Sequence, residues 1–99
     1  MSIEPAVYIV ANRRNGTLYV GVTGNLRERT WQHRNGLVPG FTAKYGLHQL
    51  VWFEFHATFD TAIPREKAIK EWRRAWKIEL IEQTNPYWRD LFADLVDAP

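Results

Sequence analysis

Two short apolar runs, separated by turn-forming residues, constrain this chain more than any other feature. Residues 7–10 and 17–22 are rich in valine, isoleucine and tyrosine, which is typical of strands. Residues 12–16 read Asn-Arg-Arg-Asn-Gly, and asparagine and glycine favour tight turns. The two runs are therefore predicted to form an antiparallel β-hairpin, and helices must cover the small sheet to which it belongs.

A capped helix and a third strand are predicted to follow the hairpin. Asn25 suits an N-cap, with Glu28 at the position of its capping-box partner. This helix is expected to reach about Arg34, where the following Asn-Gly stops it. Residues 37–46 are expected to form a loop with a short helical turn, and residues 50–55 are expected to form an apolar strand.

One long helix is predicted in the second half of the chain. It begins at residue 60 or 61, has Pro64 in its first turn, and ends near residues 84–86. Five apolar residues fall in one stripe of this helix, which is expected to face the core. The stripe comprises Ala62, Ile69, Trp72, Trp76 and Leu80. A last helical segment is expected at about residues 88–96, with Trp88 also in the core.

The expected elements follow the order β-β-α-β-α-α. This order predicts an α/β fold of the α+β type, with a small three-stranded antiparallel sheet flanked by helices. The 99 residues suit a single domain over residues 1–99. Zero cysteines exclude a disulfide, a thiolate zinc site and a cysteine nucleophile. No apolar run is long enough for a membrane span and no secretion signal is visible, so a cytoplasmic location is expected.

Charge is distributed unevenly along the chain. Residues 13–48 carry six basic residues and one acidic residue, a local charge of +5. Residues 79–99 carry five acidic residues and one basic residue, a local charge of −4. The basic half suits a polyanion such as nucleic acid, or it forms an ordinary solvated surface. Charge alone leaves both interpretations open.

Two tyrosines and an arginine–histidine pair are the first candidates for a site. Tyr8 and Tyr19 are an odd number of residues apart, so in an antiparallel hairpin they can lie directly opposite each other, closed by a two-residue or four-residue loop. The alternative is an aromatic pair in the core. Arg29 and His33 are four apart on one helical face with Leu26. An arginine and a histidine that point inward need partners. A lone inward arginine is usually part of a structural ion pair, but a bound anion better explains an arginine–histidine pair beside two tyrosines.

Two tripeptides and one spacing carry a resemblance to a known family. Residues 6–8 read Ala-Val-Tyr, and residues 19–21 read Tyr-Val-Gly. Gly21, Arg29 and His33 follow in a Gly-x7-Arg-x3-His spacing. Together these features resemble the paired signature and the second motif of the GIY-YIG nuclease superfamily. The first tripeptide has alanine where that family usually has glycine, which predicts a slightly tighter fit there.

Further segments extend the resemblance over about residues 5–91. Glu66 matches the metal-binding glutamate of the family, and Asn85 with the following proline is similar to an asparagine segment in related proteins. Residues 41–46 and 85–91 resemble the small, stand-alone bacterial branch of the superfamily. That branch is described as similar to the nuclease domain of the bacterial excision-repair incision enzyme.

The resemblance implies a metal-dependent DNA endonuclease that hydrolyses phosphodiester bonds in DNA repair or recombination. Glu66 would hold Mg²⁺ or Mn²⁺, and Arg29 would clamp the phosphate. A tyrosine is favoured as the general base, with Tyr8 preferred, Tyr19 orienting water or phosphate, and His33 relaying a proton. Position alone offers a structural alternative for Glu66: if the preceding proline is the first helical residue, the carboxylate sits at N3, where the helix dipole favours it.

Several basic residues are predicted to contact the DNA backbone, although each of them also suits a solvated surface. They are Arg13, Arg14, Arg27, Arg34 and Lys44. Asn85 is expected to cap the C-terminus of the long helix, with a secondary role in the site. The expected partner is DNA with branched, flapped or damaged structure, with a protein partner for target choice and no membrane. One alternative is a nucleic-acid-binding module that lacks turnover or needs a partner; another is a protein-interaction domain that uses the acidic C-terminal region.

Overall fold

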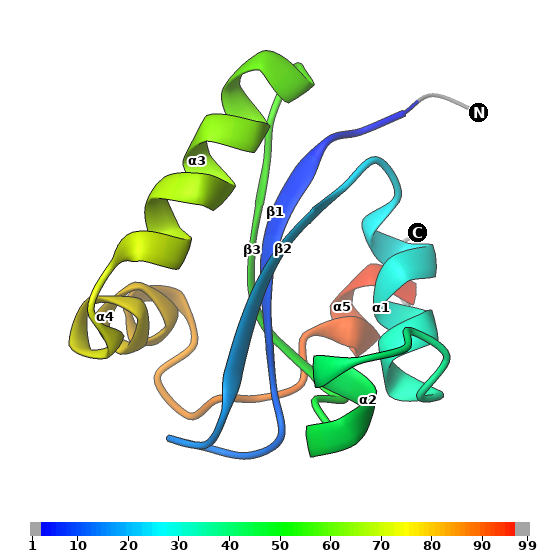
Figure 1. Cartoon of the computed structure of the whole chain (residues 1–99), viewed down its shortest axis with the longest axis vertical. Helices are drawn as coiled ribbons and strands as arrows, with labels where there is room; N and C mark the ends of the chain where they lie inside the picture. Colours follow the sequence, from blue (N-terminus) through cyan, green and yellow to red (C-terminus); the bar gives the residue numbers. More distant parts are fainter. Residues whose placement is uncertain (1–2, 97–99) are drawn as a thin grey trace.

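The computed structural model describes residues 3–96, which form a three-stranded sheet with helices on both sides (Figure 1). The strands are β1 (Ala6–Ala11), β2 (Leu18–Thr23) and β3 (Gln49–Phe55). The helices are α1 (Leu26–Arg34), α2 (Phe41–Tyr45), α3 (Phe59–Glu71), α4 (Arg74–Thr84) and α5 (Phe92–Val96). The sheet is antiparallel, with strand order β2-β1-β3. The predicted fold class is confirmed, and the expected short helical turn is α2.

The central strand β1 separates two clusters of buried side chains. Val7, Ile9 and Ala11 point toward α3 and α4, where an apolar core forms. Their neighbours Tyr8 and Val10 point toward the other side, where the core includes residues of α1 and leucines near the C-terminus. This alternation follows from the two-residue period of a strand. Figure 1 shows α3 and α4 on one side of the sheet and α1 and α5 on the other.

The hairpin between β1 and β2 has a different register from the predicted one. Tyr8 lies opposite Gly21, and Tyr19 lies opposite Val10. The prediction that the two tyrosines face each other directly is wrong, because the connection spans six residues, 12–17, instead of two or four. The side chain of Asn12 widens this loop by accepting a hydrogen bond from the N–H of Thr17 at 3.0 Å. The offset is an even number of residues, so both tyrosines still lie on the same face of the sheet.

The predicted long helix is in fact two helices. Trp72 and Arg73 have extended backbone, with ψ of 148° and 154°, and they separate α3 from α4. The prediction of one continuous apolar stripe is therefore wrong, and the side chain of Trp76 is 49% exposed. The bend brings α4 back to β3, where Ile81 is completely buried, and Trp88 beyond α4 is buried as predicted. A straight continuation would carry these side chains away from the sheet.

The start of α3 also differs from the prediction. The helix begins at Phe59 with Thr58 as its N-cap, so Pro64 lies in the second turn and not in the first. The proline has no N–H to donate to the carbonyl of Asp60, the residue four positions earlier. Glu66 consequently lies well beyond N3, and stabilisation by the helix N-terminus does not explain this carboxylate.

The other helix ends follow from local capping. The N–H of Glu28 donates to the side-chain oxygen of Asn25 at 3.1 Å, which confirms the predicted N-cap of α1. At the C-terminal end, α5 begins at Phe92 instead of residue 88, because Trp88 has a φ of +57° that no helix continues. The indole of Trp88 donates to a carboxylate oxygen of Glu82 at 2.7 Å. None of the helices within residues 3–96 has the length and apolar character needed to cross a membrane.

Candidate active site

A buried hydrogen bond joins the sheet to α1. The hydroxyl of Tyr8, on β1, lies 3.0 Å from Nε2 of His33, on α1. Only 3% of Tyr8 and 2% of His33 is exposed. The other ring nitrogen of His33, Nδ1, is buried without a hydrogen-bond partner among the described residues. Burying this polar pair costs free energy, and the hydrogen bond between the two groups offsets only part of that cost.

Burial sets the protonation state of both groups. Burial, followed by the nearby charges of Arg29 and His48, lowers the pKa of His33 from 6.5 to about 4. The imidazole is therefore neutral at pH 7. Burial of the Tyr8 phenol is the main cause that raises its pKa, and the nearby Tyr19 phenol and Glu66 carboxylate raise it further. The guanidinium of Arg29 acts in the opposite direction and lowers it. The phenol is therefore protonated, and only added positive charge nearby makes it easier to deprotonate.

Gly21 makes room for the Tyr8 ring. A Cβ at this position would lie 2.5 Å from both Cζ and the hydroxyl oxygen of Tyr8, which is closer than real contacts allow. The Tyr8 ring thus lies directly over the backbone of β2, the strand that pairs with β1 in antiparallel orientation. Because β2 is an edge strand, the hydroxyl of Tyr8 is carried toward the open side of the sheet.

Tyr19, on β2, is where side chains from the two sides of the sheet meet. Its ring centre lies 6.2 Å from that of His33, on the α1 side. From α3, Nζ of Lys70 lies 5.5 Å from the centre of the same ring. Lys70 in turn pairs with Glu66, with 3.0 Å between Nζ and Oε2. Lys70 is absent from the predicted site, although its position four residues after Glu66 on a helix was a usable signal.

Arg29 supplies an available positive charge. It lies half-buried on α1, one turn before His33. Among the described residues it forms no ion pair or side-chain hydrogen bond, yet its charge influences the pKa of both Tyr8 and His33. A guanidinium next to buried polar groups, with no carboxylate on it, is suited to binding an anion such as phosphate.

Glu66 is the carboxylate that could hold a metal. Its side chain is mostly buried on α3 and is 9% exposed as a residue. Within residues 3–96 no group of three or more histidine, aspartate and glutamate side chains is arranged to hold a metal ion. One hard oxygen donor suits a Mg²⁺ ion that keeps its waters and shares a substrate phosphate, and it does not suit a cage made entirely of protein ligands.

Comparison with known proteins places this arrangement in a family. The family model of the GIY-YIG catalytic domain matches residues 4–79, which contain all five residues of the predicted catalytic set. The chain belongs to the GIY-YIG family. The matched stretch includes both tripeptide signatures, α1 and α3, so the residues that meet around β2 are those of the nuclease superfamily's domain.

The relatives of this GIY-YIG chain are small bacterial proteins. A UPF0213 protein of Clostridium perfringens is 39% identical over 75 residues, which cover 76% of this chain and 80% of the relative. A UPF0213 protein of Staphylococcus saprophyticus is 34% identical over 77 residues, covering 78% and 93%. The solution NMR structure of a UPF0213 protein from Bacillus halodurans has a TM-score of 0.56 at 22% identity, covering 92% of this chain and 96% of the other. That likeness confirms the fold.

The five basic residues predicted to contact nucleic acid are spread over the GIY-YIG domain. Arg13 and Arg14 are exposed in the hairpin loop, and Arg27 is exposed on α1. Arg34 pairs with Asp90 and lies 4.8 Å from the ring centre of Phe92. This arginine therefore attaches α1 to the C-terminal segment, and its charge is largely neutralised. The fifth residue, Lys44, lies on α2.

Lys44 lies exposed on α2, with Nζ 5.4 Å from the ring centre of Tyr45. Phe41 of the same short helix lies 6.4 Å from the ring centre of Tyr19. The helix α2 therefore borders the tyrosine site, and Lys44 is well placed for a solvent-side contact with a ligand there.

Asn85 has a structural role in the described chain. It ends α4, and its side-chain amide donates to the carbonyls of Val51 at 3.1 Å and Arg89 at 2.8 Å. Its side-chain oxygen accepts from the N–H of Arg89 at 2.9 Å. The predicted C-cap is confirmed. These bonds tie the segment after α4 to β3, and none of them reaches the tyrosine site.

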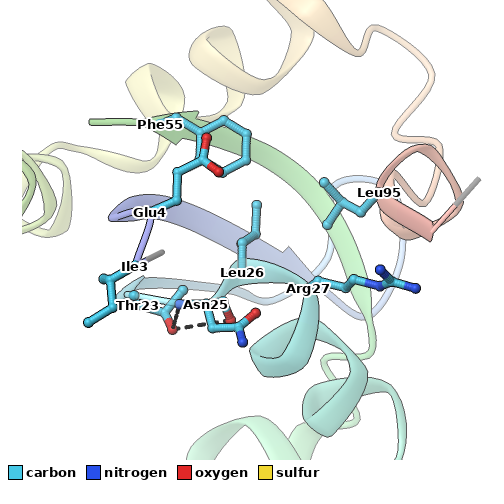
Figure 2. Close-up of a pocket in the computed structure, with 9 residues that line it drawn as sticks. Ile3, Glu4, Thr23, Asn25, Leu26, Arg27, Phe55 and Leu95 are labelled. Atoms are coloured by element: carbon cyan, nitrogen blue, oxygen red, sulfur yellow. Dashed lines mark hydrogen bonds between the residues drawn. The ribbon is translucent and has the colours of Figure 1, made fainter. Parts of the chain in front are cut away.

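A hollow of the GIY-YIG domain lies away from these residues. It measures about 660 Å³ and lies between the start of α1, Phe55 at the end of β3 and Leu95 of α5 (Figure 2). At its rim the N–H of Asn25 donates to the hydroxyl of Thr23 at 3.1 Å. Arg27 lines this hollow, but none of the five predicted catalytic residues does. This hollow is therefore separate from the candidate site around β2.

Proposed function

We propose that this GIY-YIG protein is a metal-dependent DNA endonuclease that hydrolyses phosphodiester bonds in DNA repair or recombination. The observation that carries the proposal is the convergence at β2. The buried Tyr8–His33 pair and Arg29 approach from one side of the sheet, and Glu66 approaches from the other. A general base, a phosphate clamp and a metal ligand are the groups that phosphodiester hydrolysis requires.

Arg29 and a metal ion held by Glu66 would make the phosphate more reactive. A phosphodiester resists attack because its oxygens are negatively charged. Arg29 can donate two parallel hydrogen bonds to those oxygens and neutralise charge that develops in the transition state. Glu66 is the residue that would hold Mg²⁺ or Mn²⁺, and a bound ion supplies further charge neutralisation on the phosphate.

The Tyr8–His33 hydrogen bond provides a route for the proton of the attacking water. In our proposal the water gives a proton to the Tyr8 oxygen while Tyr8 passes its own proton to Nε2 of His33. The neutral state of His33 is required, because only an unprotonated Nε2 accepts. This transfer avoids a free phenolate, which burial of Tyr8 disfavours. Tyr19 then orients the water or the phosphate.

The choice of target is proposed to come from DNA structure or a partner. Residues 3–96 contain no helix-turn-helix or zinc-finger element that would read bases. Contacts to phosphates and to shape are then expected to dominate. Branched, flapped or damaged DNA is the proposed substrate class, with a second protein selecting the target in the cytoplasm.

A nicking assay tests the proposed function. Supercoiled plasmid and labelled flapped, branched, duplex and single-stranded oligonucleotides are incubated with protein and Mg²⁺ or Mn²⁺. Wild type is expected to nick DNA only with metal. Glu66→Gln and Arg29→Ala are expected to lose nicking while their circular dichroism stays unchanged. Glu71→Gln, an exposed carboxylate on the same helix, is the matched control and should keep activity.

Two outcomes of this assay would contradict the proposal. Wild type that cleaves none of these substrates with either metal would refute an endonuclease acting by itself. Full activity in Glu66→Gln would refute the assigned metal ligand.

A second candidate is a nucleic-acid-binding module without turnover. The contact that favours it is the pair between Lys70 and Glu66, which neutralises the buried carboxylate of the site. This alternative predicts DNA binding that weakens steeply with salt and no cleavage under any metal condition. The same set of substrates distinguishes the two candidates.

A further inference from the structure

A second hollow lies at the hairpin loop, beside the start of α4. It measures about 430 Å³ and is formed by residues 15–18 and by three long side chains. All three are cationic: Arg13 comes from the loop, and Arg74 and Lys77 come from the first turn of α4. No acidic residue lines it. We refer to it as the loop groove.

The cations of the loop groove are positioned without being neutralised. Nη2 of Arg74 donates to the carbonyls of Asn15 at 2.7 Å and Gly16 at 2.5 Å. Nζ of Lys77 donates to the carbonyl of Lys70 at 3.2 Å. Backbone carbonyls fix the direction of these side chains but carry no net charge. Among the described residues, neither Arg74 nor Lys77 pairs with a carboxylate, so the positive charge remains available to a ligand.

The loop groove adjoins the tyrosine site. Leu18 lines the groove and directly precedes Tyr19 on β2. Lys77 bonds to the backbone of Lys70, whose own side chain lies over the Tyr19 ring. Side chains of successive strand residues point to opposite faces of the sheet, so Leu18 and Tyr19 place the groove and the tyrosine site on the two sides of the edge strand β2. A nucleic-acid strand that passes over this edge can place one phosphate at Tyr19 and another at the groove.

The opposite flank of the site is less suited to a polyanion. There Arg34 is paired with Asp90, and Arg89 is paired with Asp94. Basic residues on that flank are thus partly neutralised by the acidic C-terminal segment. The two paired arginines of that flank therefore offer less free charge than the cations of the loop groove.

We propose that the loop groove binds a backbone phosphate of the DNA strand that flanks the scissile bond. The inference rests on the proposed function and adds the path of the substrate, from Tyr19 past Leu18 toward Arg13 and α4. A free phosphate ion has the same chemistry as a backbone phosphate, so the test includes both sources.

Binding of a fluorescently labelled oligonucleotide, followed by anisotropy without divalent metal at several salt concentrations, tests the groove. Lys77→Ala is expected to weaken binding about fivefold at low salt and to reduce the slope of log K against log salt by about one. Arg13→Ala is expected to act in the same direction, and Lys77→Arg to restore binding. Arg89→Ala, which removes a positive charge from the other flank, is the control and should leave the slope unchanged. Melting temperatures confirm that each variant is folded.

Several results would overturn the inference. Wild-type affinity and slope in both Lys77→Ala and Arg13→Ala would do so, as would an equal loss in Arg89→Ala. Inorganic phosphate supplies the second arm. Phosphate that raises the melting temperature of wild type but not of Lys77→Ala would show that the groove binds an anion. If Lys77→Ala also binds the oligonucleotide as tightly as wild type, the groove holds free anions and not the DNA backbone.

The nicking assay separates this inference from the proposed function. Metal-dependent nicking by wild type, with groove variants that bind normally, refutes the groove alone. No nicking by wild type, with weakened binding in Lys77→Ala, refutes the endonuclease and retains the groove as a nucleic-acid contact.

Discussion

The two faces of the sheet share the same strands but bury different chemistry. Toward α3 and α4, β1 presents only apolar side chains, those of Val7, Ile9 and Ala11. Toward α1, the same strand presents Tyr8, hydrogen-bonded to His33. The side chains of β1 on the first face gain free energy from burial alone. The second places polar groups where water is excluded, which is unfavourable for folding and useful for chemistry.

The cost on the polar face can be located at one atom. Nδ1 of His33 is buried without a partner among the described residues, and an unsatisfied buried polar group costs about 1–3 kcal/mol. On β1, the side chains that stabilise the fold and the polar side chain of the candidate site therefore lie on opposite faces. Four predictions follow from this comparison, in order of their expected effect on the free energy of unfolding.

Ile9→Ala tests the apolar face and should have the largest effect. The side chain is completely buried on the central strand, and truncation leaves a cavity. We expect the free energy of unfolding to fall by about 3 kcal/mol, as measured by urea denaturation. A loss no greater than that of Tyr8→Phe would break the comparison.

Acidification tests the polar face through His33. Its pKa is about 4 in the folded protein against 6.5 for the free side chain, so the unfolded state binds the proton more tightly. This contribution to stability is fully present above pH 6.5 and is lost as the pH falls from 6.5 toward 4, by up to about 3 kcal/mol. Urea denaturation of wild type and His33→Gln at each pH isolates it. A constant difference between the two proteins over this range would refute the assignment.

Gly21→Ala tests the fit between β2 and the Tyr8 ring. The new Cβ would lie 2.5 Å from the phenol, so the ring must move and its bond to His33 must break. We expect a loss of about 2 kcal/mol. The loss should shrink in the background Tyr8→Ala, which removes the clash. Equal losses in both backgrounds, measured as a double-mutant cycle, would show that Gly21 serves the backbone only.

Tyr8→Phe should separate stability from activity most sharply. The ring is kept and one hydroxyl is lost, so the free energy of unfolding should change by only about 1 kcal/mol. In the nicking assay, loss of a general base reduces the rate by about 100-fold or more. A variant with wild-type nicking would remove Tyr8 from the proton route and leave Tyr19 as the base.

The three strands and the N-cap of α1 could be predicted because their signals are local. The N-cap at Asn25 and the strand around Ile9 depend on neighbouring residues alone, and both agree with the structure. The spacing of Arg29 and His33 also predicted their common face, since four residues make about one helical turn. The residues that carry the family signature were therefore recognisable before the fold was known.

The features that the sequence did not predict depend on contacts between segments that are distant along the chain. The break at Trp72 lies in a sequence without glycine or proline, and packing of α4 on β3 decides it. The hairpin register depends on contacts across the loop, among them the hydrogen bond that the N–H of Thr17 donates to the side-chain oxygen of Asn12. The approach of Lys70 to Tyr19 requires α3 to reach the edge strand, which no local pattern encodes.

The even offset of the hairpin makes the alternative register a competing state. Sliding β2 by two residues, so that Tyr8 faces Tyr19, would return every side chain to its original face. Hydrophobic burial therefore discriminates weakly between the two pairings. The free-energy difference that selects the native pairing comes from the hydrogen bond of Asn12 within the loop and from the space at Gly21 that the Tyr8 ring fills. Gly21 thus helps to select the native pairing, because a residue without a side chain leaves room for the Tyr8 ring where the two lie opposite each other.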